Sequence, residues 1–357
     1  MTNKENIKAF LDYLRSSGND DQVFDEEKIL ADLDKDSSHH SIAIKVLSVF
    51  GGILASITFI GFLFLAGLSN SGTALIITGA MLLSLSVWLN KEFDTILMDT
   101  ASISAFLISF LLMAYGLLEM ELDPNLVLII FILLSLVCLI WVHNYVYAFI
   151  SIIVINGCLL TLIMSNEAYD LIHVLIMFLT VVLLMVFHKE AYLITKYKKL
   201  SGLYLPLRLG LVISFLTCLF MLSKGGLFPF RSELVWFSSV VMIAGVLYSL
   251  ESVFKVMDIE ETSKKNIIYG SALLLLAPTI LSPAITGSLL ILLLCFRVNY
   301  KTGLAIGVIS FIYTIGQYYY DLHFTLLIKS VLMMFSGLLF LVLYFVIHKN
   351  LMANEKH

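Results

Sequence analysis

Residues 317–330 have the sequence QYYYDLHFTLLIKS, in which a polar and aromatic stretch separates two apolar segments. Three tyrosines and Asp321 close the first segment, and Lys329 lies inside the second. The same alternation of long apolar runs and short polar breaks extends back toward the N-terminus as far as about residue 44. Because a membrane-spanning helix needs about 20 mostly apolar residues, the pattern predicts an all-α, polytopic integral membrane protein.

The composition excludes a water-soluble globule. Of the 357 residues, 60% are hydrophobic and only 13% are charged, whereas soluble domains carry about 25% charged residues. The formal net charge of −4 offers no concentrated basic face for nucleic acid. The four cysteines lie in apolar runs without a C-x-x-C pair, so they predict buried apolar side chains rather than a disulfide framework or a metal site.

Twelve membrane spans are predicted by length and hydropathy. The ninth and tenth are short and meet at Ser282 and Pro283, so they form either two spans or one re-entrant hairpin. The predicted spans are residues 44–67, 72–89, 97–118, 125–142, 145–165, 169–187, 203–223, 234–250, 266–281, 283–297, 303–320 and 325–347.

The chain outside the spans divides into an N-terminal arm and a short tail. Residues 1–42 predict a cytoplasmic arm with two short amphipathic helices, residues 43–348 a transmembrane bundle, and residues 349–357 a cytoplasmic tail. Lysine and arginine alternate sides along the chain, which is the positive-inside pattern. With both termini cytoplasmic, the cytoplasmic segments carry Lys91, Lys189, Lys196, Lys198, Lys199, Lys255, Lys264, Lys265, Arg297, Lys301 and Lys349. The opposite side then holds only Lys224 and Arg231.

Lys329 is the most informative ionisable residue. A lysine inside a span is a candidate for a functional site, although a lysine near the end of a span also snorkels to the headgroups. Tyrosines at a membrane boundary can equally be interfacial anchors. Both interpretations remain open at this point. The candidate polar or transport site consists of Lys329, Asp321, Tyr318, Tyr319, Tyr320 and Thr325.

Two further polar residues rank lower. Arg208 follows Pro206 near the predicted start of the seventh span, so we expect its guanidinium to snorkel toward anionic headgroups. Asn156 lies in the middle of the fifth span, where a hydrogen bond to a neighbouring helix is the expectation. The histidines mostly lie at segment edges, which predicts interfacial solvation rather than metal ligation. No nucleotide-binding, metalloprotease or nucleophile-elbow motif occurs, so the sequence predicts neither an enzyme nor a cofactor or metal.

The C-terminal quarter resembles an uncharacterised bacterial membrane family, the domain of unknown function 4401. Its signature runs from Tyr318 to Ser330 as YYYxLxxTLLxKS, preceded by Pro283, Phe296 and Gly303 and followed by Gly337. Ala284 and Cys295 stand where the family favours glycine. The resemblance implies a multi-pass protein of the bacterial cytoplasmic membrane without an assigned activity. It also implies partners in a hetero-oligomeric complex, since such genes occur beside another multi-pass family and a small anchored protein with a G-D-Y-x-x-L motif.

Two functions remain open from the sequence. A transporter- or channel-like subunit predicts a wet polar cavity near Lys329, whereas a structural or assembly subunit of a membrane complex predicts a lysine that faces headgroups. The lipid bilayer is the expected surrounding in both cases, and neither a small-molecule substrate nor a coupling ion can be identified from the sequence.

Overall fold

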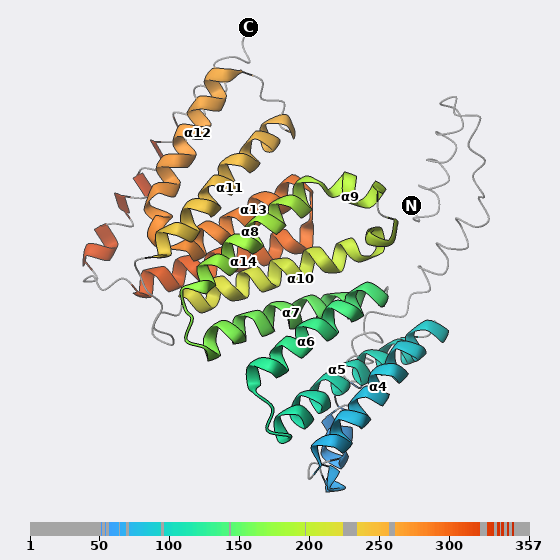
Figure 1. Cartoon of the computed structure of the whole chain (residues 1–357). Coiled ribbons are helices and arrows are strands. Elements are labelled where there is room, and N and C mark those ends of the chain that lie inside the picture. Colours follow the sequence, from blue (N-terminus) through green and yellow to red (C-terminus); the bar gives the residue numbers. More distant parts are fainter. Residues whose placement is uncertain are drawn as a thin grey trace, which may run out of the picture. The chain divides into compact units, whose positions relative to one another are not determined.

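The described part of the chain is helical throughout, without a strand, in the computed structural model (Figure 1). The described residues are 51, 54, 57–63, 65–68, 71–93, 96–142, 144–196, 198–223, 234–256, 261–321, 327–331, 334–335, 337–338, 341–342 and 345. The N-terminal arm of residues 1–42, the tail of residues 349–357 and Thr325 lie outside them. The predictions for those segments therefore stay predictions.

The longer described stretches contain eleven α-helices and one 3-10 helix. They are α4 (Gly72–Glu92), α5 (Ile96–Glu119), α6 (Pro124–Trp141), α7 (Tyr145–Ser165), α8 (Leu171–His188), α9 (Glu190–Lys196), α10 (Lys198–Ser223), α11 (Val235–Val256), α12 (Thr262–Leu276), the 3-10 helix η3 (Ala277–Leu281), α13 (Pro283–Arg297) and α14 (Lys301–Asp321).

Seven of the described helices are long and apolar enough to cross a membrane: α4, α5, α6, α7, α8, α10 and α11. This finding supports a membrane helical protein, as the sequence predicts. α13 is apolar but has only 15 residues, and α14 has 21 residues with a polar, aromatic last turn.

The chain forms two compact units that divide at Met113. In the first unit, α4 packs against the first part of α5, where the Ser86 hydroxyl donates to the carbonyl of Ser102 over 2.8 Å. Gly79 lies against the backbone of Ser109. Small residues permit this close approach of helix backbones, which suits packing in lipid.

The second unit is built around four helices, α8, α10, α13 and α11, each of which packs against the next and α11 against α8. Its core lies inside this ring, where Leu179, Phe215, Met242 and Leu290 are fully buried. α14 covers α13 and α10, whereas α7 packs on the other side of α10 and α6 packs on α7 (Figure 1). α12 and η3 lie along α11.

Three of the described helices end with the same local structure, which determines how the chain leaves each helix. Glu121, Glu167 and Asn299 have φ of 55°, 54° and 53°. They terminate α5, α7 and α13 with the hydrogen bonds of a Schellman motif, in which a left-handed residue satisfies the last helical carbonyls. Asparagine tolerates this conformation better than most residues. After α13 the motif turns Tyr300 back toward the helix, since its N–H donates to the carbonyl of Cys295 over 2.9 Å.

Some helices extend beyond the predicted spans, because hydropathy detects only the apolar part of a helix. The seventh span, predicted over residues 203–223, agrees with the apolar segment Gly202–Ser223, whereas its helix α10 begins earlier, at Lys198, and contains Pro206 in its interior. The predicted loop after α8 holds a helix of its own, α9. α11 was predicted to end at residue 250 and continues to Val256.

Candidate functional site

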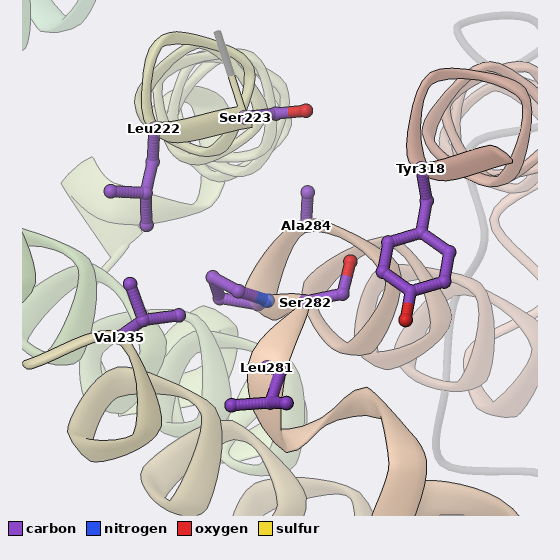
Figure 2. Close-up of a pocket in the computed structure, with 8 residues that line it drawn as sticks. Leu222, Ser223, Val235, Leu281, Ser282, Ala284 and Tyr318 are labelled. Atoms are coloured by element: carbon purple, nitrogen blue, oxygen red, sulfur yellow. The ribbon is translucent and has the colours of Figure 1, made fainter. Parts of the chain in front are cut away.

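A pocket of about 240 Å³ lies at one end of the second unit (Figure 2). It is formed where α10 ends, α11 and α13 begin, and the last turns of α14 pass. Its walls combine apolar side chains with hydroxyl groups. The lining residues are Leu222, Ser223, Val235, Leu281, Ser282, Pro283, Ala284 and Tyr318.

The break between η3 and α13 shapes this pocket. Ser282 interrupts the helical backbone with φ −134° and ψ 77°. Pro283 then starts α13, where its missing N–H costs no intrahelical hydrogen bond. Beneath the pocket, the hydroxyl of Thr286 donates to that of Thr279 over 2.8 Å, which joins η3 to α13. The sequence correctly indicated this break, and the structure adds that it faces a pocket.

Hydroxyl groups point to one side of the pocket. Ser282 is 9% exposed, and its side chain does not cap α13. In Figure 2 the oxygens of Ser223 and Ser282 both point toward the side where Tyr318 stands. Among the predicted site residues whose side chains the structure describes, Tyr318 is therefore the one that lines this pocket.

Lys329 lies beside the pocket's tyrosine segment rather than among the lining residues. Its ammonium donates to the carbonyl of Tyr319 over 2.8 Å and lies 4.9 Å from the centroid of the Tyr319 ring. Tyr319 and Tyr320 pack edge to face, and the Tyr320 side chain is 78% exposed. The structure thus brings Lys329 and Tyr319 together and turns Tyr320 outward. Asp321 ends α14, and its side chain is outside the described part.

A second polar cluster occupies the opposite ends of the same helices, around Arg208. The Arg208 side chain is 6% exposed, and its Nη1 lies 3.3 Å from Oε1 of Glu190. Its guanidinium carbon lies 3.7 Å from the ring centroid of Tyr300 and 5.2 Å from that of Tyr204. The guanidinium therefore faces the protein interior, contrary to the prediction that it snorkels toward headgroups.

One polar atom of this cluster lacks a hydrogen-bond partner among the described residues. Nε of Arg208 is buried without a hydrogen-bond partner, which is costly for a charged group. Burial raises the pKa of Tyr300, and the nearby Arg208 charge opposes that shift. Both observations indicate a low-dielectric surrounding in which the contact between Arg208 and Glu190 is stronger than at a surface.

The same region also supplies hydrogen-bond donors to the last carbonyl groups of α8. Its last carbonyls have no intrahelical donors, and side chains supply them instead. The Tyr204 hydroxyl donates to Val186 over 3.2 Å, and Nη1 of Arg297 donates to Phe187 over 3.4 Å. Since these donors come from α10 and α13, the end of α8 is joined to both helices.

Two other sequence expectations turn out differently. The Asn156 amide donates to the carbonyl of Ile152, one turn earlier in its own helix, over 2.9 Å rather than to a neighbouring helix. His173 is 2% exposed, and its Nδ1 lies 3.1 Å from the Ser238 hydroxyl of α11. Interfacial solvation was therefore the wrong expectation for His173.

Sequence reasoning missed Ser282, Glu190 and Tyr300. Ser282 was noted only as a junction, although a serine before Pro283 is a signal for a helix start. Glu190 and Tyr300 carry no local signal, because their partner Arg208 is 18 residues from the former and far from the latter. Among the described residues, no group of three or more histidine, cysteine, aspartate or glutamate side chains could hold a metal ion.

Comparison with known protein families matches residues 42–350 to a domain of unknown function, DUF4401. Neither the curated proteins nor the solved structures contain a match to this chain. The matched range includes both polar regions described above.

Proposed function

Since the chain belongs to the DUF4401 family, for which no activity is assigned, we propose its function from the geometry: a transporter- or channel-like subunit. Its working site is the pocket at Ser282 and Tyr318. The observation that carries the proposal is a pocket at a broken helix, with the hydroxyl side chains of Ser223, Ser282 and Tyr318 in a largely apolar wall. Irregular backbone at membrane depth is tolerated where it is buried in protein or lines a wet cavity.

The depth of the pocket supports this proposal. We take the topology as twelve spans with both termini on the cytoplasmic side of a bacterial inner membrane, as the charge pattern favours. Arg297 then marks the cytoplasmic boundary, and Ser282 lies 15 residues away along α13. At 1.5 Å per residue the distance is about 22 Å, whereas the hydrocarbon core is about 30 Å thick. The pocket therefore opens below the outer surface rather than at it.

The character of the site favours a small solute. Its volume of about 240 Å³ is below the range of roughly 300–1,000 Å³ typical of sites for drug-sized ligands. No nucleophile, base and orienting group converge there among the described residues, so our proposal includes no enzymatic role.

The alternative is a structural or assembly subunit of a hetero-oligomeric membrane complex. That function would require the pocket end to be covered by a partner and closed to solutes. The two functions therefore differ in whether water and solutes reach Ser282 in the membrane.

We would test the proposal with Ser282→Cys and a membrane-impermeant, negatively charged thiosulfonate reagent. In native membranes, the reagent should label this variant, while Ile309→Cys, whose native side chain is 69% exposed on the apolar face of α14, should stay unlabelled. The wild-type protein controls for its four cysteines, three of which are buried.

Solute flux through the Ser282→Cys variant should also differ before and after labelling. In proteoliposomes, light scattering after an osmotic shift would follow the entry of potassium chloride, potassium acetate, glycine and glycerol. We expect at least one solute to enter faster than in protein-free liposomes, and labelling of Ser282→Cys to remove the difference. A Ser282→Cys variant that stays unlabelled, or flux equal to that of protein-free liposomes for every solute, would overturn the proposal.

A further inference from the structure

The ends of four helices border the pocket, and their partial charges offset one another. α11 begins at Val235 and α13 at Pro283, both of which line the pocket. α10 ends there at Ser223, and α14 ends three residues beyond Tyr318. A helix end carries about half an elementary charge, positive at the N-terminus and negative at the C-terminus. The two N-terminal ends and the two C-terminal ends therefore nearly cancel.

Lys329 breaks this balance. Its ammonium is bonded to the Tyr319 carbonyl in the last turn of α14, so a full positive charge lies at a C-terminal end that borders the pocket. Because the helix ends offset one another, about one net positive charge remains when the described helix ends and side chains are counted. No acidic side chain lines the pocket among the described residues. The pocket is thus suited to a negative charge rather than a positive one.

Ser282 supplies an unused hydrogen-bonding group at the same place. It is more than nine-tenths buried, yet its hydroxyl makes no hydrogen bond among the described residues and does not cap α13. Figure 2 shows this oxygen pointing into the pocket toward Tyr318. Buried hydroxyls are usually paired, so a hydroxyl that has no partner among the described residues and faces a cavity is available to donate to a group bound in the pocket.

We propose that the pocket binds the carboxylate of a small solute. The carboxylate would accept hydrogen bonds from the Ser282 hydroxyl and from the N–H of Ala284 at the start of α13, where anions are favoured. Pro283 has no N–H, and the N–H of Ile285 donates to the Ser282 carbonyl over 3.1 Å. The Tyr318 hydroxyl provides a further donor at the opposite wall. This inference rests on the proposed function, because it names the class of solute that the transport site takes.

The test compares a carboxylate with its neutral analogue. Wild-type protein in nanodiscs of zwitterionic lipid is titrated with sodium acetate or with acetamide at constant ionic strength. Thermal unfolding is followed by tryptophan fluorescence, to which Trp236, the neighbour of Val235, contributes. A ligand that binds only the folded state raises the apparent Tm with concentration. We expect acetate to raise it and acetamide to leave it unchanged.

Three variants test whether acetate binds at this pocket. Ser282→Ala should bind acetate about tenfold more weakly, since a hydrogen bond to a charged group is lost. Lys329→Met should also weaken binding without altering a lining residue. Ser271→Ala removes a serine of α12 that bonds within its own helix, to the Ile268 carbonyl over 2.9 Å, and should bind acetate as the wild type does.

The outcomes separate this inference from the proposed function. Equal shifts with acetate and acetamide, or wild-type acetate binding by Ser282→Ala, would refute the carboxylate site. If flux of a neutral solute is nevertheless blocked at Ser282→Cys, transport stands and only the solute class is wrong. Inorganic phosphate, titrated in the same way, tests whether a lipid phosphate is the true occupant; tighter binding of phosphate than of acetate would overturn the carboxylate assignment.

Discussion

Replacing Glu190 with glutamine tests whether the buried Arg208 depends on this acidic partner. At 3.3 Å, two opposite charges attract by about 5 kcal/mol at an effective dielectric constant near 20. Part of this attraction offsets the cost of removing Arg208 from water, and the Glu190 side chain is still 28% exposed. Breaking a buried pair costs about 3–5 kcal/mol, so this partly hydrated pair should lose about 2 kcal/mol on Glu190→Gln.

A double-mutant cycle isolates that interaction. Arg208→Met removes the buried charge together with its contact to the Tyr300 ring, and it leaves Glu190 able to turn toward water. In the Arg208→Met background, Glu190→Gln should therefore cost much less than it does in the wild type. The assay is thermal unfolding in detergent micelles, where a loss of about 2 kcal/mol corresponds to a fall in Tm of about 3 °C for a chain of this length.

An exposed pair serves as the control. Glu251 and Lys255 lie 4.0 Å apart on α11 with exposed fractions of 61% and 78%, and such pairs contribute little to stability. Glu251→Gln should therefore leave the Tm unchanged. Equal losses from Glu190→Gln with and without Arg208 would refute the claim that the guanidinium depends on this carboxylate.

Three further predictions concern packing and local backbone. Gly287→Ala should lower stability by about 1–3 kcal/mol, because a Cβ there would press on Leu219 in the core; Gly270→Ala, with open space around it, should be neutral or slightly stabilising in the same unfolding assay. The raised pKa of Tyr300 means that the unfolded chain ionises first as pH rises past about 10, so stability should fall there and the fall should shrink in Tyr300→Phe, as measured by Tm against pH. Asn299→Val should cost about 1–2 kcal/mol at φ 53°, whereas Asn299→Gly should be tolerated, and equal Tm values for the two variants would contradict the assigned strain.

The apolar helices could be predicted closely from the sequence. The span predicted over residues 145–165 coincides with α7, and the span over 97–118 lies within α5. These helices are bounded by residues that signal their own ends, such as Asn144, whose side chain accepts from the N–H of Val146. Where a helix includes polar sequence at its start, as α10 does before residue 203, hydropathy placed the start of the helix too late.

The candidate site was only partly predictable. The tyrosine stretch was recognised by its composition, and Tyr318 lines the pocket. Which of the three tyrosines does so depends on the rotation of α14 against α13. Gly303 and Gly307 signalled a close approach between helices, and they lie against Cys295 and Leu292 of α13. Glycines four apart indicate the contact, but they do not identify the partner helix.

The sequence by itself determined the solvent of this protein and the family to which it belongs. Apolar runs too long and too poorly charged for water must lie in lipid as helices, because only helices satisfy their own backbone there. The tertiary structure alone decided that Arg208 turns inward to Glu190 and Tyr300, and that Ser282 and Tyr318 meet across a pocket. Periodicity along the chain reaches only one or two turns, whereas these contacts join residues 18 to 92 positions apart, so their partners are chosen by how the helices pack.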